Sequence, residues 1–427
     1  MKRGTASVAA ALVLGLAASV LVAAPASADN IRDRQYWLAD YGVQKAWATT
    51  KGAGVTIAVI DTGVDGSHPD LTGSVIGGTD VSGVGASNGQ TPVGADSKHG
   101  TMVASLLAGH GHGTGDGILG VAPESKILSV SVGFGVGSVG SDDQIAQAVR
   151  WSADHGADII NMSLTRNTLD WPTSWDDAFL YAMDKGVIVV AAAGNRGSGT
   201  TEVGAPATMP GVVVVAGVDQ NGRASFDASS QGITLSVSAP SEGLVGAAPG
   251  GGYYSWAGTS GATPLVAGVL ALIKASHPRL SAGNVINRLT ATARSQGNPI
   301  VYGSGLFDAS AAVSATVASV ATNPAAELKE WIRLNRRAVT SADPIPTNSP
   351  TRPPTGTAEP TVVAAPVSPF GRVLPAVGDL RDIGIPLLVY AVFATLVILV
   401  LRSILRDVIR LRRSGRFRES RAARRRP

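Results

Sequence analysis

Continuous runs of apolar residues, many of them β-branched, alternate along the chain with stretches of helical character. Runs that are apolar at every position are typical of strands buried on both faces of a parallel sheet. Such strands are predicted at Val55–Ile60, Lys126–Val132, Ile159–Leu164, Gly186–Ala193 and Val212–Val218. The repeated strand–helix–strand order over residues 52–319 predicts one α/β domain, a doubly wound, mostly parallel sheet with helices on both faces.

Capping residues and glycines set the expected ends of the helices. Ser141 is expected to cap a helix over Asp142–His155 that Gly156 ends, because serine favours N-caps and glycine favours helix C-termini. A second run, Gly261–Lys274, is apolar on nearly every side. It is too short to cross a membrane, so we expect a helix buried in the core, with Pro264 in its first turn.

The two ends of the chain predict where the protein resides. Lys2 and Arg3 precede an apolar run that ends at Ala26-Ser27-Ala28, a pattern typical of a secretory signal peptide over residues 1–28. An uncleaved N-terminal anchor is the alternative. Residues 383–401 carry no charge and would span roughly 28 Å as a helix, enough for one C-terminal transmembrane helix.

Basic residues follow the predicted transmembrane helix. Residues 402–427 hold eleven arginines against Asp407 and Glu419, and a basic segment beside a span stays in the cytoplasm. This tail contributes +9 and the signal peptide +2 to the net charge of +4, which leaves −7 for residues 29–401. The basic tail could by itself indicate a nucleic-acid partner, but its place behind a span favours membrane topology, and no nucleic acid is expected.

Composition divides the rest of the chain into three parts. Residues 29–51 are a short N-terminal extension that we expect to wrap the domain, and residues 52–319 are the α/β domain. Residues 320–382 are a stalk, because nine of the 24 prolines fall between Pro344 and Pro375 and such a stretch cannot build a core. The chain has no cysteine, which excludes a thiol nucleophile and thiolate metal ligands.

Three short phrases place an acid, a base and a nucleophile in order along the domain: Asp61-Thr-Gly-Val, His99-Gly-Thr and Gly258-Thr-Ser260-Gly. Asp61 follows a predicted strand directly, so it lies at the carboxyl edge of the sheet, where open α/β folds build their sites. Acyl transfer needs a hydroxyl, an imidazole that takes its proton and a carboxylate that orients the imidazole. The phrases predict those roles for Ser260, His99 and Asp61.

Each phrase alone also has a purely structural explanation. An Asp after a strand often closes a turn, a serine before a helix is most often an N-cap, and a lone histidine is most often a packing residue. Asp65 and Asp70 are alternative acids, but neither follows the strand directly. The other histidines lie in turns, in glycine-rich loops and at helix ends: His68, His110, His112, His155 and His277. Only the three phrases together point to catalysis.

A fourth element, Ala191-Ala-Ala193-Gly194-Asn195, ends a predicted strand. The Asn195 side-chain amide is expected to donate a hydrogen bond to the oxyanion of a tetrahedral intermediate, beside the Ser260 N–H at a helix N-terminus. A plain turn is the alternative interpretation of this element.

These four elements, in this order, resemble the subtilisin-like serine proteases, or subtilases, over about 265 residues. The resemblance implies a subtilisin-like fold without a cofactor, with Asp61 as the orienting acid, His99 as general base and acid, Ser260 as nucleophile and Asn195 as oxyanion donor. The segment Val203-Gly-Ala-Pro-Ala207 is similar to a wall of the specificity pocket.

The same resemblance implies a set of substrate-binding residues. Ser163 and Leu164 are similar to the strand edge that pairs with an extended substrate, and Thr165 stands where a glycine is common, which narrows the cleft. Ala193 and Gly194 belong to the same expected site, beside the oxyanion donor. No calcium loop is predicted, because the pattern around Asp80 and Asp96 is too weak, and no metal site is expected.

The layout further resembles the mycosins, membrane-anchored subtilases of actinobacterial type VII secretion systems. Shared features are the signal peptide, the start at Asn30–Trp37, the Pro-rich stalk and the single span; the absence of cysteine is a departure from many mycosins. We therefore expect a membrane-anchored extracellular endopeptidase that cleaves exported proteins, with secretion-complex membrane proteins as further partners. Two alternatives stay open: a structural subunit that braces a secretion complex, and a general cell-surface subtilase.

Overall fold

The computed structural model describes residues 30–137 and 139–336. The predicted signal peptide, transmembrane helix and basic tail, and the stalk beyond residue 336, lie outside them. Within these residues, seven strands form a central sheet in the order β2-β5-β1-β6-β7-β8-β9, every pair parallel. The strands are β1 (Thr56–Asp61), β2 (Val75–Asp80), β5 (Lys126–Ser131), β6 (Ile159–Met162), β7 (Ile188–Ala192), β8 (Val213–Val218) and β9 (Val237–Pro240).

All five predicted strands lie in this sheet, each with ends within two residues of the prediction. The two outer strands were not predicted. β2 reads Val-Ile-Gly-Gly-Thr-Asp and is only partly buried, while β9 has four residues that include a serine and a proline. Neither edge strand carries the continuous apolar run that marks a strand covered on both faces.

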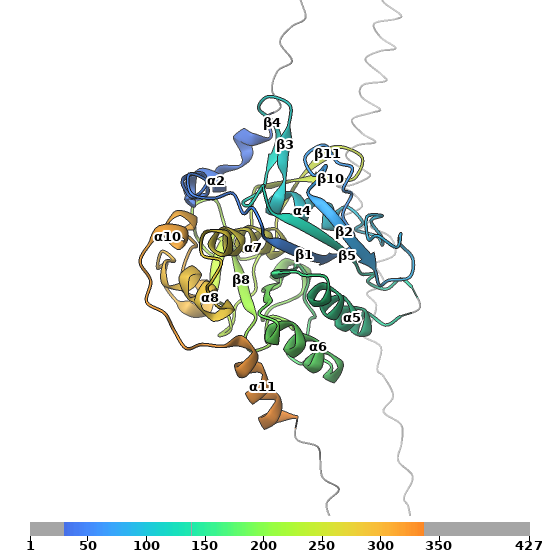
Figure 1. The fold of residues 1–427 in the computed structure, drawn as a ribbon, viewed down its shortest axis with the longest axis vertical. Coiled ribbons are helices and arrows are strands. Elements are labelled where there is room, and N and C mark those ends of the chain that lie inside the picture. The colour runs from blue at the N-terminus through green and yellow to red at the C-terminus, as the bar shows by residue number, and fades with distance from the viewer. Residues whose placement is uncertain (1–29, 138, 337–427) are drawn as a thin grey trace, which may run out of the picture. The chain divides into compact units, whose positions relative to one another are not determined.

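Alternate residues of each central strand enter two separate hydrophobic cores. In β1, Ile57 and Val59 pack into the core around α4 and α7, and Ala58 and Ile60 pack into the core around α5 and α6. Successive side chains of a strand point to opposite faces, so the sheet is covered on both sides. Figure 1 shows α5 and α6 on the side of the sheet opposite α4 and α7. The doubly wound prediction is confirmed.

The central helix of the first core is α7 (Thr259–Ser276), which packs beside α4 (His99–Ala108). In the described part of the chain, α7 alone is long and apolar enough to qualify as a membrane span, yet most of it is buried inside the domain. The expected core helix is therefore confirmed. Pro264 lies in its second turn rather than its first, because the helix begins earlier than expected.

The second core holds α5 (Ser141–Asp154), α6 (Thr173–Asp184) and α11 (Pro324–Asn335). The stalk predicted from residue 320 therefore starts later, because Ala325 and Leu328 of α11 are buried in this core. Gly156 ends α5 with a positive φ of 78°, as predicted. The N-cap of α5 is Gly140 rather than Ser141, which is the first helical residue and makes no capping bond. Extended Gly140 is an acceptable N-cap, and two aspartates in the first turn complement the helix dipole.

The remaining elements surround this framework. They are η1 (Arg32–Arg34), α2 (Tyr36–Asp40), α3 (Val43–Ala46), the hairpin β3 (His110–His112) with β4 (Asp116–Leu119), η2 (Arg196–Ser198), the hairpin β10 (Leu244–Ala248) with β11 (Gly252–Trp256), α8 (Ala282–Ala291), α9 (Pro299–Tyr302) and α10 (Ala309–Ser314). The N-terminal extension packs on the domain: Trp37 is fully buried, the Gln35 amide pairs with the backbone of Leu119, and Trp47 Nε1 donates to Val121 O at 2.8 Å.

Candidate active site

Asp61 and His99 meet at the carboxyl edge of the sheet. Asp61 is the last residue of β1 and His99 the first residue of α4. His99 Nδ1 lies 2.8 Å and 3.0 Å from the two carboxylate oxygens of Asp61. Because an ionised carboxylate can only accept, Nδ1 carries the proton and Nε2 is left as the basic nitrogen. Asp61 is buried, and the His99 side chain is 19% exposed.

The glycines of the two motifs allow this approach. Gly63 has a φ of 97°, which disfavours any residue with a Cβ. A Cβ on Gly100 would stand 2.3 Å from the Gly63 carbonyl oxygen, so only glycine lets the start of α4 touch the turn after β1. Thr62 ties the two segments together by accepting a hydrogen bond from Gly100 N at 3.0 Å. The Asp-Thr-Gly and His-Gly motifs thus act as one packed unit.

The environment of His99 tunes its basicity. Burial lowers the pKa of His99, but the charge and hydrogen bond of Asp61, with a smaller effect of Asp96, outweigh it and raise the pKa above its usual value. The indole ring of Trp256 packs edge-on against the imidazole, with the ring centroids 5.6 Å apart. Asp61 therefore stabilises the imidazolium form that a general base must pass through.

Ser260 is the second residue of α7, and its hydroxyl donates to Ser163 O at 3.1 Å. The contact is reciprocal, since Ser163 Oγ donates to Ser260 O at 2.8 Å. Pro264 explains the second bond: it has no N–H, so the carbonyl four residues before it needs another donor. Gly258, not Ser260, is the N-cap, so this hydroxyl does not cap its helix. Ser163, whose carbonyl accepts from this hydroxyl, also lines a cavity with His99.

Asn195 lies between the end of β7 and the start of α7. Its Oδ1 accepts hydrogen bonds from Thr259 N at 2.8 Å and Thr259 Oγ1 at 2.9 Å. Those two donors fix the orientation of the amide, and Nδ2 is left as a donor. The Nδ2 atom lies beside Gly258, where a Cβ would approach it to 3.1 Å. The arrangement holds an amide donor next to the N-terminus of α7.

A cavity of about 260 Å³ lies beside His99. Asp61, Thr62, Asp96, His99, Phe134, Ser163, Leu164 and Thr165 line it. The segment Ser163–Thr165 leaves the end of β6 and forms one side of this cavity. Three of the five expected substrate-binding residues thus face one space with the Asp61–His99 pair.

Ala193 and Gly194 are buried and are not among the residues that line this cavity. Ala193 N donates to Val215 O at 3.0 Å, and Gly194 N donates to Thr259 Oγ1 at 3.2 Å. Gly194 O accepts from Ser230 N at 2.7 Å. These backbone groups have partners inside the protein, so the structure does not bring the two residues to the cavity that Ser163, Leu164 and Thr165 line.

The other acids and histidines near β1 form separate clusters. Asp70 is fully buried and binds His112 Nδ1 at 2.6 Å and the Tyr253 hydroxyl at 2.8 Å. Asp65 accepts from Ser67 and from Gly250 N. Asp61 is therefore the acid that contacts His99. Among residues 30–137 and 139–336, no three His, Cys, Asp or Glu side chains gather as metal ligands would.

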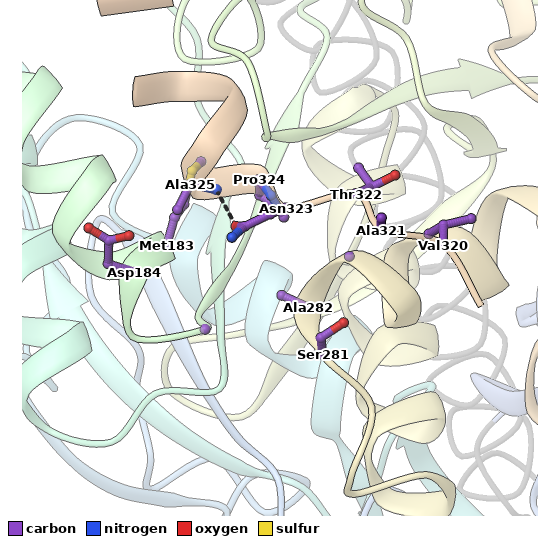
Figure 2. A pocket seen from close by; sticks show the side chains of 12 residues that line it. Met183, Asp184, Ser281, Ala282, Val320, Ala321, Thr322, Asn323, Pro324 and Ala325 are labelled. Carbon is purple, nitrogen blue, oxygen red and sulfur yellow. Dashed lines mark hydrogen bonds between the residues drawn. The ribbon is translucent and has the colours of Figure 1, made fainter. Parts of the chain in front are cut away.

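A second, larger cavity of about 460 Å³ is lined by the C-terminus of α6, the N-terminus of α8 and residues 320–325. Figure 2 shows Asp184 of α6 and Ser281, the N-cap of α8, at this cavity, with Ala325 N donating a hydrogen bond to Asn323 Oδ1. No residue of the Asp61–His99 site lines it. The C-terminus of α6 leads into the start of β7, so this cavity lies at the opposite edge of the sheet from the site.

Several residues of the site carry no recognisable sequence signal. Thr259 precedes Ser260 and belongs to the same motif, but nothing in the sequence indicates that it orients Asn195. Trp256, Asp96 and Phe134 reach the site from loops and a hairpin, and no spacing in the sequence relates them to His99.

Comparisons with known proteins agree with this geometry. The profile of the subtilase family, Peptidase_S8, matches residues 52–305. The chain is 40% identical over 264 residues to subtilisin E of Bacillus subtilis (strain 168), covering 61% of this chain and 66% of that protein. It is also 40% identical to subtilisin of Bacillus pumilus, covering 61% of this chain and 91% of that protein. The chain therefore belongs to the subtilase family of serine endopeptidases.

Solved structures support the same assignment and the resemblance to mycosins. MycP1 from Mycobacterium smegmatis matches with a TM-score of 0.59 and 31% identity, over 68% of this chain and 87% of that chain. The MycP3 protease of the type VII (ESX-3) secretion system matches with a TM-score of 0.56 and 29% identity, over 68% and 89%. Fervidolysin from Fervidobacterium pennivorans matches with a TM-score of 0.58 and 32% identity, over 70% of this chain and 49% of that chain. The predicted subtilisin-like fold is confirmed.

Proposed function

We propose that this protein is a membrane-anchored extracellular serine endopeptidase that cleaves exported proteins through an acyl-enzyme, as a mycosin-type subtilase. The observation that carries the catalytic part is the Asp61–His99 pair, with His99 Nδ1 2.8 Å from the Asp61 carboxylate. Ser163 lines the cavity beside this pair, and its carbonyl accepts from the Ser260 hydroxyl. Membership of the subtilase family supports the reaction class.

In the proposed reaction, Ser260 Oγ gives up its bond to Ser163 O and turns to His99 Nε2. Oγ attacks the scissile carbonyl while its proton passes to Nε2, and Asp61 stabilises the imidazolium that forms. His99 then donates this proton to the leaving amine. Water then attacks the acyl carbonyl while His99 takes a proton from it. As the bond between the acyl carbon and Oγ breaks, His99 returns this proton to Ser260 Oγ, which releases the acid product and restores the serine.

The developing oxyanion is proposed to lie between Asn195 Nδ2 and the Ser260 N–H. Ser260 is in the first turn of α7, so its N–H has no partner one turn earlier in the helix. The helix dipole favours negative charge at that point. Donors held in advance, as Thr259 holds Asn195, need no reorganisation when the charge appears.

The cleft supports a protein substrate in extended form. Ser163, Leu164 and Thr165 continue beyond the end of β6 and line the cavity beside His99. An extended peptide can add to a backbone segment of this kind by main-chain hydrogen bonds. Gly204 packs closely against this segment, since a Cβ there would stand 1.8 Å from Arg166 O and 2.8 Å from Thr165 Oγ1, and we expect it to form a wall of the space for the residue that provides the scissile carbonyl.

The membrane part of the proposal rests on the sequence. The signal peptide, the uncharged residues 383–401 and the eleven arginines after them favour an external domain held by one span, with the tail inside. The similarity to MycP1 and to MycP3, a protease of a type VII secretion system, supports action on proteins exported by such a system.

Topology and role can be tested in intact cells. Protease added outside should remove the domain by cutting in the stalk and leave a small membrane fragment with Arg402–Pro427. Truncation before Ile383 should release the domain into the medium. A protected domain with a digested tail would refute the external location. A Ser260→Ala protein that restores all export and processing in a deletion strain would favour the bracing role over proteolysis.

A further inference from the structure

The cavity beside His99 combines an apolar wall with a negative rim. Leu164 and Phe134 supply the apolar surface, and Phe134 is 49% exposed although it is large and hydrophobic. Two carboxylates line the same cavity. That of Asp61 is buried and bound to His99, so Asp96 is the carboxylate that can meet a ligand.

Asp96 has room for a further cationic partner. Its side chain is 64% exposed, and its ion pair is with Lys98 at 3.9 Å, which is itself 48% exposed. Such exposed pairs contribute little to stability, so a cationic group of a ligand can replace Lys98 at little cost. The negative charge is felt inside the site, because Asp96 adds to the effects that raise the pKa of His99.

Strand geometry identifies the substrate residue that meets this cavity. Successive side chains of an extended peptide point to opposite sides. In the binding mode proposed above, the residue that provides the scissile carbonyl points toward Gly204, which packs against Thr165 and Arg166. The residue before it therefore points the other way, toward His99, Asp96 and Phe134. The cavity of about 260 Å³ has roughly the space of eight or nine liquid waters, enough for a long side chain.

We propose that Asp96 makes this subtilase prefer substrates with lysine or arginine one residue before the residue whose carbonyl is attacked. The aliphatic stem of such a side chain lies along Leu164 and Phe134, and its charged end reaches the Asp96 carboxylate at the rim. Long basic side chains bury their stems and keep their charge near water in this way. This inference rests on the proposed endopeptidase function and specifies its substrate class.

The test compares three peptides that differ only at that position, with lysine, norleucine or glutamate, and uses the purified full-length protein in detergent. Lysine and norleucine have the same four-carbon stem and differ by the terminal ammonium group, so their ratio of kcat/KM reports the contribution of that charged group. We expect kcat/KM for lysine about threefold above norleucine and about tenfold above glutamate, the range that one partly exposed charge pair supports. The ratio should shrink at high salt.

Asp96→Asn should reduce the lysine-to-glutamate ratio to about threefold or less and move the acid limb of the pH profile to lower pH. Asp184→Asn is the matched control, because this exposed aspartate ends α6 at the opposite edge of the sheet. In this variant the lysine-to-glutamate ratio of kcat/KM should stay at about tenfold. Equal rates for the three peptides, or an unchanged ratio in Asp96→Asn, would overturn the inference while the protease stands. If the wild type cleaves no peptide and Ser260 does not react with a fluorophosphonate, the proposed function fails and the inference fails with it.

Discussion

Asn195→Ala should lower kcat strongly and change KM little. The two hydrogen bonds from Thr259 to Oδ1, at 2.8 and 2.9 Å, hold Nδ2 where it can donate to the oxyanion. That donation gains strength only as charge develops, so its loss affects the transition state selectively. Loss of one such donor costs about 10²- to 10³-fold in kcat, or about 3–4 kcal/mol.

Two further variants separate donation from structure. Asn195→Asp keeps an oxygen for Thr259 but replaces the donor by a negative charge, so kcat should fall at least as far as in Asn195→Ala. Thr259→Val keeps the backbone bond and loses only the Oγ1 bond, so the loss should be smaller, about tenfold. Steady-state kinetics on one peptide, with thermal unfolding of each variant, measures both effects. A raised KM with unchanged kcat in Asn195→Ala would refute the oxyanion role.

Three more predictions concern basicity and stability. Burial lowers the pKa of His99, but the effect of Asp61 is larger and the pKa is raised overall. As the pH decreases, kcat/KM should therefore begin to fall above the ordinary histidine pKa of about 6.5. A kcat/KM that stays constant down to about pH 4 would indicate another base. Arg288→Ala should lower the free energy of unfolding by about 2–3 kcal/mol in a denaturant titration, because the buried guanidinium donates to three carbonyls at the end of α10. Arg288→Lys should recover part of this loss of stability, and an unchanged free energy of unfolding in Arg288→Ala would refute the prediction. Trp331→Ala should make α11 susceptible to limited proteolysis, because the rings of Trp331 and Trp171 pack with their centroids 4.2 Å apart. Trp331→Phe should stay resistant to cleavage, and equal cleavage of the two variants would contradict the packing.

Local patterns were sufficient for the central sheet and for the chemistry at its edge. Runs such as Ile159–Leu164 are apolar because both faces are covered, so composition alone marks them as strands. Asp61 and His99 were predictable as a pair because each stands at the end or start of an element and each belongs to a short motif. The glycines of those motifs are needed where Gly100 touches the Gly63 carbonyl.

Long-range contacts could not be predicted in the same way. The bond between Ser163 and the Ser260 carbonyl depends on where Pro264 falls in α7, which requires the true start of that helix. Asp96 and Phe134 reach the cavity from loops, where no period relates sequence to position. Edge strands such as β2 are covered on fewer sides and lack a continuous apolar run.

Covalent labelling of Ser260 tests most directly whether this site performs acyl transfer. A fluorophosphonate reacts only with a serine whose hydroxyl is activated by a neighbouring base. Mass spectrometry of the labelled full-length protein should find one adduct, on Ser260, with none on Ser260→Ala and much slower labelling of His99→Ala. A folded wild-type protein that carries no adduct, or carries it on another serine, would contradict the assignment of Asp61, His99 and Ser260.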